Sequence, residues 1–108
     1  MKMIMAVVRP DKLKEIEDTL KASNFASLTE FGVRGRGKQK GITIGDMKYE
    51  KLPKEFLMMV CKDEEVGSIV EIIEKSGRTG HIGDGKIFVL NVEEAVTIRT
   101  GSRGKEAV

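Results

Sequence analysis

The sequence predicts an α+β protein of the ferredoxin-like class, with the element order βαββαβ. Four short stretches rich in β-branched and aliphatic residues have the length of strands, and two stretches between them repeat apolar residues at helical spacing. This order is that of an antiparallel four-stranded sheet with both helices on one face. At 108 residues the chain is expected to be a single domain, residues 1–108.

The first half of the chain is predicted to supply a strand, a helix and a second strand. Residues 3–8 are continuously apolar and stop at Arg9 and Pro10, as in a strand that is buried on both faces. Asp11 is placed to cap the following helix, and Asn24 is placed to end it. Residues 28–33 alternate in polarity and predict the second strand. The apolar face of the helix consists of Leu13, Ile16 and Leu20.

The second half repeats this order after a long loop. Periodicity fails over residues 35–51, and a loop longer than about 12 to 15 residues is usually functional. Residues 56–61 predict the third strand, Asp63 is placed to cap the second helix, and residues 87–92 predict the fourth strand. That helix has Val66, Ile69, Ile72 and Ile73 on its inward face. Because several strands are apolar on both faces, we expect a partner subunit to cover the second face of the sheet.

Charge and composition restrict the partners of the chain. Its 19 basic and 17 acidic residues are intermixed and leave a net charge of +2, which does not favour a nucleic acid or an anionic membrane. The single cysteine, Cys61, excludes an intrachain disulfide and is expected to be a buried thiol. The N-terminal apolar run is too short for a signal peptide or a transmembrane helix. We therefore expect a cytoplasmic protein without membrane insertion.

The sequence lacks the residue sets of several common enzyme classes. With one cysteine and one histidine, His81, a single chain cannot build a zinc cluster or a Cys/His catalytic pair. Neither Gly-x-Ser-x-Gly nor a Walker motif is present. His81 lies between glycines in a loop and is expected to be exposed. We assign no catalytic residue and expect no enzymatic activity.

Two glycine-rich basic segments are the candidate functional parts. Residues 35–41, GRGKQKG, combine glycines that let an anion approach the backbone with cations that suit phosphate or carboxylate. Residues 79–86, TGHIGDGK, lead into the fourth strand and could aim backbone donors and Lys86 at an anion. A simpler interpretation of the first is a solvated basic turn. For the second it is a strand-entry turn in which Asp84 bonds its own backbone.

Together, these segments resemble those of a known family. The run TGHIGDGKIFVLNV at residues 79–92 is similar to the C-terminal signature of the PII signal-transduction proteins, and GRGKQKG followed by LPK at residues 52–54 resembles their effector loop. RPDKL near the start and IRTG at residues 98–101 lie at matching places, so the resemblance covers essentially the whole chain. It implies a trimeric regulator of nitrogen metabolism that binds ATP or ADP between subunits and senses 2-oxoglutarate together with Mg.

The resemblance also assigns the nucleotide site residue by residue. Phosphates would be bound by Gly83, Asp84, Gly85, Lys86 and Arg99. The nucleotide would be contacted from the other side of the cleft by Thr29, Gly35, Gly37, Lys38 and Val60, and also by Gln39. The effector loop would span about residues 36–53, the phosphate loop residues 79–86 and a C-terminal segment residues 93–108.

The site for 2-oxoglutarate would adjoin the nucleotide. The side-chain oxygen of Gln39 would bind Mg, which prefers hard oxygen ligands shared with phosphates. The keto acid end of 2-oxoglutarate would chelate the same ion beside the backbone of Lys40 and Gly41. Its distal carboxylate would meet Lys54. Without ATP and Mg the acid would have no complete site, so binding of the two ligands would be coupled.

Three features depart from the family pattern. The effector loop is a few residues shorter than in typical members, and the surroundings of Tyr49 do not match the uridylylation site of the bacterial forms. Thr97 stands where most members carry an arginine, which weakens the phosphate clamp. Met58 stands where an acidic residue is common. We expect Thr97 and Met58 to change the nucleotide affinity of the site, and the shorter effector loop to change which protein the chain binds.

The short loop and the word KLPKEF at residues 51–56 resemble a subgroup encoded beside nitrogenase genes in methanogens and some anaerobic bacteria. Members of that subgroup act on nitrogenase together with a second PII-like chain. A nitrogenase component is therefore the expected target, and the oligomer is expected to be a homotrimer or a mixture with a paralogue. The alternative target is an ammonium transporter or glutamine synthetase.

Two other functional classes are disfavoured. An RNA-binding module of the same fold would need an aromatic motif on its sheet for base stacking, and that motif is absent. A slow ATP hydrolase would need a base beside the phosphates, and the one obvious candidate, Asp84, is better explained as a turn residue.

Overall fold

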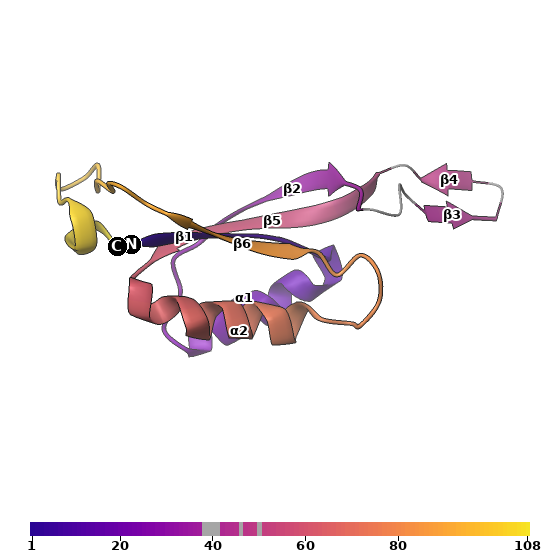
Figure 1. The fold of residues 1–108 in the computed structure, drawn as a ribbon, viewed down its shortest axis with the longest axis horizontal. Coiled ribbons are helices and arrows are strands. Elements are labelled where there is room, and N and C mark those ends of the chain that lie inside the picture. Colours follow the sequence, from indigo (N-terminus) through magenta and orange to yellow (C-terminus); the bar gives the residue numbers. More distant parts are fainter. Residues whose placement is uncertain (38–41, 46, 50) are drawn as a thin grey trace.

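The structure is a computed structural model, and it describes residues 1–37, 42–45, 47–49 and 51–108. An antiparallel sheet with the strand order β2-β5-β1-β6 carries both long helices on one face (Figure 1). Its strands are β1 (Lys2–Val8), β2 (Thr29–Gly35), β5 (Leu52–Cys61) and β6 (Lys86–Asn91), and the helices are α1 (Leu13–Ala22) and α2 (Val66–Gly77). The predicted ferredoxin-like order is therefore confirmed. The short hairpin β3 (Ile42–Ile44) and β4 (Met47–Tyr49) lies within the predicted loop.

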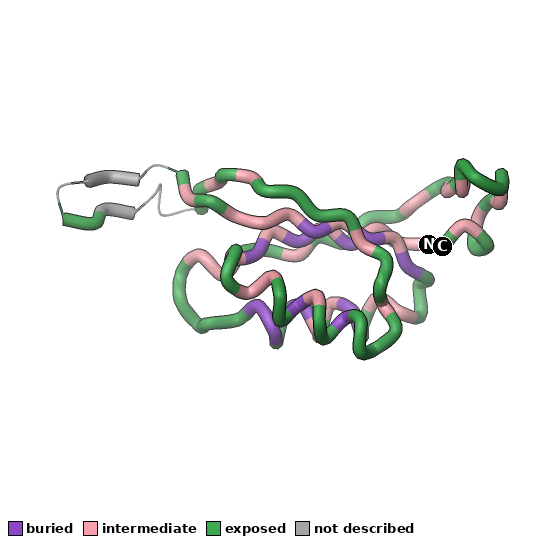
Figure 2. The backbone as a smooth tube through the Cα atoms, turned by 180° about the vertical axis from the view of Figure 1, so that it is seen from behind, coloured by how far each residue is buried: buried purple, intermediate pink, exposed green. Residues whose placement is uncertain are grey.

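The core lies between the sheet and the helices, where the buried segments gather in Figure 2. Alternate residues of a strand point to one face, and a helix presents a stripe at steps of three and four. These two periodicities bring the apolar residues of β1 and β5 against those of α1 and α2. The fully or almost fully buried core residues include Ile4, Ala6, Ile16, Leu20, Leu57, Met59, Ile69 and Ile73.

The sheet face away from the helices, which we call the open face, is also apolar. Strand pairing places Met5 of β1 opposite Met58 and Phe88, and it places Phe31 of β2 opposite Phe56, whose ring it stacks on at 4.8 Å. Phe31 is 48% exposed and Phe88 is 51% exposed. In the described part of the chain no element covers this face. The expectation that β1 is buried on both faces therefore holds on its helix side, while Met3, Met5 and Val7 are half-buried.

Both helices start differently from the prediction. Asp11 lies inside a short 3-10 helix, Pro10–Lys12, and no side chain caps α1, so its predicted role as the N-cap is wrong. Asp63 begins a second 3-10 helix, Asp63–Glu65, and pairs instead with the N-terminal ammonium group of Met1 at 2.8 Å. The backbone N–H of Lys62 donates to the side chain of Glu65 at 2.9 Å. A local carboxylate therefore still satisfies the backbone at this turn.

Two other boundaries follow from local backbone chemistry. Asn24 has a left-handed φ of 68° and lies one residue beyond the C-cap of α1, as predicted. β5 begins at Leu52, four residues before the predicted third strand. The prediction stopped short because Pro53 disfavours a strand interior. Since β1 ends opposite Glu55, residues 52–54 pair with β2 alone, and the proline interrupts no ladder with β1.

The C-terminal segment, residues 93–108, lies at the end of the sheet opposite the β3–β4 hairpin (yellow in Figure 1). It is held by a bridge between Val96 and Arg103 and by a turn in which the N–H of Gly101 donates to the carbonyl of Thr97 at 2.8 Å. It ends in the 3-10 helix Gly104–Ala107. The segment is therefore a small hairpin of its own beyond Asn91.

Candidate functional site

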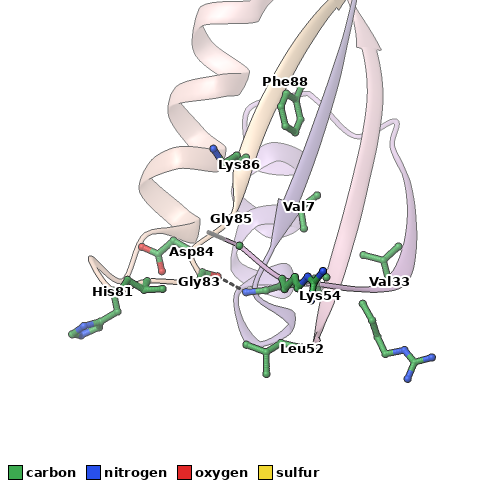
Figure 3. Close-up of a pocket in the computed structure, with 15 residues that line it drawn as sticks. Val7, Val33, Leu52, Lys54, His81, Gly83, Asp84, Gly85, Lys86 and Phe88 are labelled. Carbon is green, nitrogen blue, oxygen red and sulfur yellow. Dashed lines mark hydrogen bonds between the residues drawn. The ribbon is translucent and has the colours of Figure 1, made fainter. Parts of the chain in front are cut away.

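A cleft of about 610 Å³ opens at one end of the sheet (Figure 3). Its walls are the end of β2 with the residues that follow it, the start of β5, and the loop of residues 79–86 that enters β6. Both glycine-rich segments therefore contribute to one hollow. The basic residues along its lining are Arg34, Arg36, Lys54, His81 and Lys86, and Asp84 is the acidic one.

The 79–86 loop depends on glycine at two positions. Gly85 has a φ of +101°, and a Cβ there would lie 1.7 Å from the carbonyl oxygen of Val7, so a side chain cannot be accommodated without moving β1. Gly83 has a φ of +103° and packs against Arg9 and Lys54. The close approach of this loop to the end of β1 is thus built into its sequence.

Asp84 organises the loop from within. Its carboxylate accepts hydrogen bonds from the backbone N–H groups of Thr79 and Gly80, both at 2.9 Å, and from the hydroxyl of Thr79. The Thr79 hydroxyl and the Arg9 guanidinium, which also donates to this carboxylate, hold the pKa of Asp84 well below its usual range. The turn expected as the simpler interpretation is therefore present, with Asp84 bonding local backbone.

The side chain of Asp84 does not bind every N–H group of the loop. Among the described residues, the N–H groups of Ile82, Gly83 and Asp84 have no hydrogen-bond acceptor. Consecutive backbone donors in a glycine-rich turn form a concavity that suits an anion. A turn and an anion cradle are therefore compatible in one loop, because Asp84 shapes the turn while these three donors stay unpaired among the described residues.

Two cations from the sheet hold the loop. Arg9 follows β1 directly, and its Nε donates to Asp84 at 2.9 Å while its terminal nitrogen donates to the carbonyl of Ile82 at 2.8 Å. Lys54 of β5 donates to the carbonyl of Gly83 (dashed in Figure 3). Burial lowers the pKa of Lys54 below its ordinary value, and the nearby Arg9 lowers it further.

Sequence reasoning missed Arg9 as a site residue. Its partners, Ile82 and Asp84, are more than 70 residues away in the chain, and no local pattern joins them. The signal that could have found it is chemical. Asp84 in an otherwise anion-attracting loop needs a cation, and Arg9 belongs to the RPDKL word already noted.

The structure brings together one part of the predicted site and separates another. The residues that line the cleft are Gly35, Gly37, Lys54, Gly83, Asp84, Gly85 and Lys86. Thr29, Val60 and Arg99 do not line it. Lys38, Gln39, Lys40 and Gly41, and with them the expected Mg ligand, lie outside the described residues. His81 is exposed, and its ring points away from Lys54 and Phe88 in Figure 3.

Strand pairing explains the separation. Lys86 is opposite Val7 at one end of β1, whereas Asn91 is opposite Lys2 at the other, so Arg99 follows from the far end of the sheet. Five residues of strand span about 17 Å. Thr29 pairs with Met58 toward that same far end. Thr29 and Val60 were expected to share a wall with Gly35 and Gly37, and within one chain they do not.

In residues 1–37, 42–45, 47–49 and 51–108, no three His, Cys, Asp or Glu residues are grouped so that they could hold a metal ion. No helix in the same part of the chain is long and apolar enough to cross a membrane. Cys61 is a free, buried thiol whose pKa burial raises, as expected for a core residue.

Comparison with known proteins identifies relatives over nearly the whole chain. Residues 1–102 match the family described as nitrogen regulatory protein P-II. The chain is 50% identical to nitrogen fixation nifHD region GlnB-like protein 1 of Methanobacterium ivanovii, over 96% of this chain and 99% of the relative. It is 52% identical, over the same shares of both chains, to the protein of that name in Methanococcus maripaludis. It is also 48% identical to nitrogen regulatory protein P-II 2 of Methanothermobacter thermautotrophicus, over 100% of this chain and 97% of the relative.

Proposed function

Because the chain belongs to the nitrogen regulatory protein P-II family, whose members are signal-transduction proteins and not catalysts, we propose that it senses ATP or ADP together with 2-oxoglutarate. The observation that carries this proposal is the cleft of about 610 Å³ in which both glycine-rich segments meet. A volume of several hundred cubic ångströms suits a ligand of nucleotide size.

The 79–86 loop would bind the phosphates. Its unpaired N–H groups at Ile82, Gly83 and Asp84 would donate to phosphate oxygens, and Lys86 would add a charge-assisted contact. The Asp84 carboxylate, already engaged by Thr79, Gly80 and Arg9, would shape this cradle and leave the phosphates to the backbone.

The other half of the site would come from a second copy of the chain. Thr29, Val60 and Arg99 lie toward the far end of the sheet, so one end of a molecule would meet the opposite end of the next. Such a head-to-tail contact closes into a ring when the rotation allows, and three copies are usual in this family. The apolar open face, with Phe31 and Phe88 half-exposed, would be buried in that ring.

Binding of 2-oxoglutarate would depend on the nucleotide. Mg would take oxygen ligands from the phosphates, from the keto acid and from Gln39, beside the backbone of Lys40 and Gly41. Lys54 lines the cleft and already points at Gly83, from where its ammonium can also reach a carboxylate. The three donors of an ammonium group allow both contacts at once.

The target would be a nitrogenase component, reached through the effector loop. Support comes from relatives whose names place them in nifHD regions of methanogens. The β3–β4 hairpin projects beyond the sheet, where it is free to contact another protein (Figure 1). We extend the proposal to action in the cytoplasm and to a ring that is either homotrimeric or mixed with a paralogue.

Asp84, considered above as a base for ATP hydrolysis, would not serve that role. Its carboxylate accepts four hydrogen bonds, and its lowered pKa makes it a weak proton acceptor. We therefore expect ATP turnover far below about one per second, a rate that even modest enzymes reach. Release of inorganic phosphate from Mg-ATP measures this directly.

Calorimetry tests the ligand proposal. In the presence of Mg-ATP, 2-oxoglutarate should bind, and the Lys54→Ala and Gln39→Ala variants should lose that binding. The Lys14→Ala variant is the matched control, because Lys14 is exposed on α1 and pairs with Asp18. Equal binding of 2-oxoglutarate with and without nucleotide would contradict the coupled site.

A pull-down from a cell lysate tests the target. A nitrogenase component should be retained without 2-oxoglutarate and released with it. Retention of an ammonium transporter or glutamine synthetase in its place would favour the alternative target of the same family. Salt-resistant retention of RNA would contradict a protein-regulating role.

A further inference from the structure

We propose that Arg9 is the positioning residue of the anion cradle, which holds the 79–86 loop in shape and neutralises the charge that Asp84 brings into it. The inference deepens the proposed function and rests on it, because the cradle is taken to bind nucleotide phosphates. Arg9 does not line the cleft. It would act through the loop and not on the ligand.

Side chains hold the loop: Asp84 and Thr79 act from within it, and Arg9 and Lys54 act from outside it. Among the described residues, no backbone-to-backbone hydrogen bond of the turns and loops involves residues 79–85. Gly80, Gly83 and Gly85 all have a positive φ, and glycines lose the most conformational freedom on ordering. Side-chain contacts must therefore hold this backbone in one shape.

Arg9 supplies two of those contacts with a fixed geometry. Nε reaches the Asp84 carboxylate and a terminal nitrogen reaches the Ile82 carbonyl, so one planar guanidinium holds two loop residues. A Cβ on Gly83 would lie 3.3 Å from the guanidinium, which shows how closely the loop packs on it. Lys54 adds one contact, but Lys54 is also expected to bind 2-oxoglutarate.

The backbone of Arg9 is itself fixed. It follows the last residue of β1, has an extended φ of −66° and ψ of 137°, and precedes Pro10, which restricts it to that region. Its carbonyl accepts from the N–H of Lys12 at 3.1 Å. The guanidinium is thus presented by the rigid sheet, while its partners belong to a glycine-rich loop.

Charge gives Arg9 a second task. An ionised Asp84 next to bound phosphates would repel them, and opposite charges are needed to offset it. The Arg9 and Asp84 side chains are 27% and 26% exposed, so their pairing is only partly screened by water. With Arg9 present, the loop offers its N–H groups without an uncompensated carboxylate.

Calorimetry of Mg-ATP binding to the full chain tests this assignment. Arg9→Ala should weaken ATP binding by about tenfold or more, as expected when a charge-assisted two-point contact is lost. The ATP affinity of Arg9→Lys should lie between those of the unmodified chain and Arg9→Ala, because one ammonium cannot span both loop partners. The matched control is Arg78→Ala, which removes an arginine at the base of the same loop that pairs with Glu74 on the helix surface; its affinity should stay within about twofold.

A rescue variant separates positioning from a purely structural role. Adding Asp84→Asn to Arg9→Ala removes the uncompensated charge, while the amide oxygen can still accept from the N–H groups of Thr79 and Gly80. The double variant should bind ATP about threefold or more tightly than Arg9→Ala alone. No recovery, or full ATP affinity in Arg9→Ala, would overturn the proposal.

Hydrogen exchange without any ligand keeps this test separate from the nucleotide proposal. The amides of Thr79 and Gly80 should exchange faster in Arg9→Ala, while those of β1 and β5 stay protected. If the unmodified chain fails to bind ATP, the proposed function fails, yet faster exchange would still support the loop-positioning role of Arg9. Unchanged exchange at these two amides would contradict it.

Discussion

Gly85 is the residue whose identity the fold constrains most sharply. A left-handed φ alone excludes most side chains by strain, but at Gly85 the carbonyl of Val7 also occupies the space of a Cβ. Gly80 has a similarly positive φ of +86°, and nothing lies within 4 Å of the position of its Cβ. The two positions therefore form a matched pair. A side chain at Gly80 would meet backbone strain alone, and a side chain at Gly85 would meet strain and a clash with the backbone of β1.

Alanine substitution should separate these two effects. Gly80→Ala should lower the free energy of unfolding by about 1–2 kcal/mol, the usual cost of a left-handed side chain. Gly85→Ala should lower it by about 3 kcal/mol or more, because β1 or the loop has to move. Chemical denaturation at one protein concentration measures both, since oligomers change stability with concentration. Equal losses would contradict the clash.

Asp84 should make stability depend on acid pH. Its pKa is lower in the folded chain than in the unfolded chain, so it contributes stability that is present above the unfolded value of about 3.9 and is lost as the pH falls further toward the folded value. The difference in unfolding free energy between the unmodified chain and Asp84→Asn should therefore shrink between about pH 5 and pH 2. A difference that stays constant over this range would rule out the tight engagement of this carboxylate.

At the scale of elements, β5 is the strand on which the site depends. Its first three residues run past the end of β1, and this extension places Lys54 beside the 79–86 loop. Had the strand begun at Phe56, as predicted from its apolar run, Lys54 would have lain outside any strand, directly after the predicted effector loop of about residues 36–53. The extension of β5 along β2 thus makes Lys54 a strand residue with a fixed direction.

The β3–β4 hairpin is an element separate from the core. Ile44 pairs with Met47, and Gly45, which follows Ile44, takes a φ of +60°. Figure 1 shows the hairpin projecting past the sheet, away from the core residues of α1 and α2. A change in the hairpin should therefore affect binding of the target protein without affecting the folding of the core.

Gly45→Val tests that separation. A β-branched residue is strained at this φ, so the turn should be disrupted while the core remains intact. The melting temperature should stay within about 2 °C and the ATP affinity within about twofold, while retention of the target protein should fall. Thermal denaturation, calorimetry and the lysate pull-down measure the three properties. A large fall in melting temperature would show that the hairpin contributes to the fold.

At the scale of the whole molecule, the proposed nucleotide site needs two chains. The cleft and the C-terminal segment lie at opposite ends of the sheet. Lys86 and Arg99 of one chain are therefore expected to serve two different sites. This arrangement predicts complementation between variants that are inactive on their own.

Lys86→Ala and Arg99→Ala should each weaken ATP binding strongly in homomeric rings. When the two are unfolded together in equal amounts and refolded, about a quarter of the sites should combine an intact Lys86 with an intact Arg99, as random head-to-tail assembly requires. The stoichiometry of tight ATP binding measures this fraction. Mixtures without any tight sites would show that both residues serve the same site from one chain, or that the rings do not form.

Much of the fold was predictable because its signals are local. Helical spacing in residues 13–20, alternation along strands and the glycine at a strand entry all act through neighbours in the chain. The β3–β4 hairpin was missed although the alternation of its strands and the turn residue Gly45 were visible, since the surrounding glycines suggested irregular structure. The caps at Asp11 and Asp63 were wrong because short 3-10 turns precede both helices.

The sequence by itself determined the fold class, the family and the two glycine-rich segments, because periodicity, turn chemistry and characteristic motifs all lie in consecutive residues. Tertiary structure alone decided that Arg9 and Lys54 hold the 79–86 loop, and that Thr29, Val60 and Arg99 lie away from it. Those facts depend on strand order and register, which set the distance between residues far apart in the chain. The same register assembles half of the proposed site in one chain and, in the proposed ring, would leave the other half to a neighbouring chain.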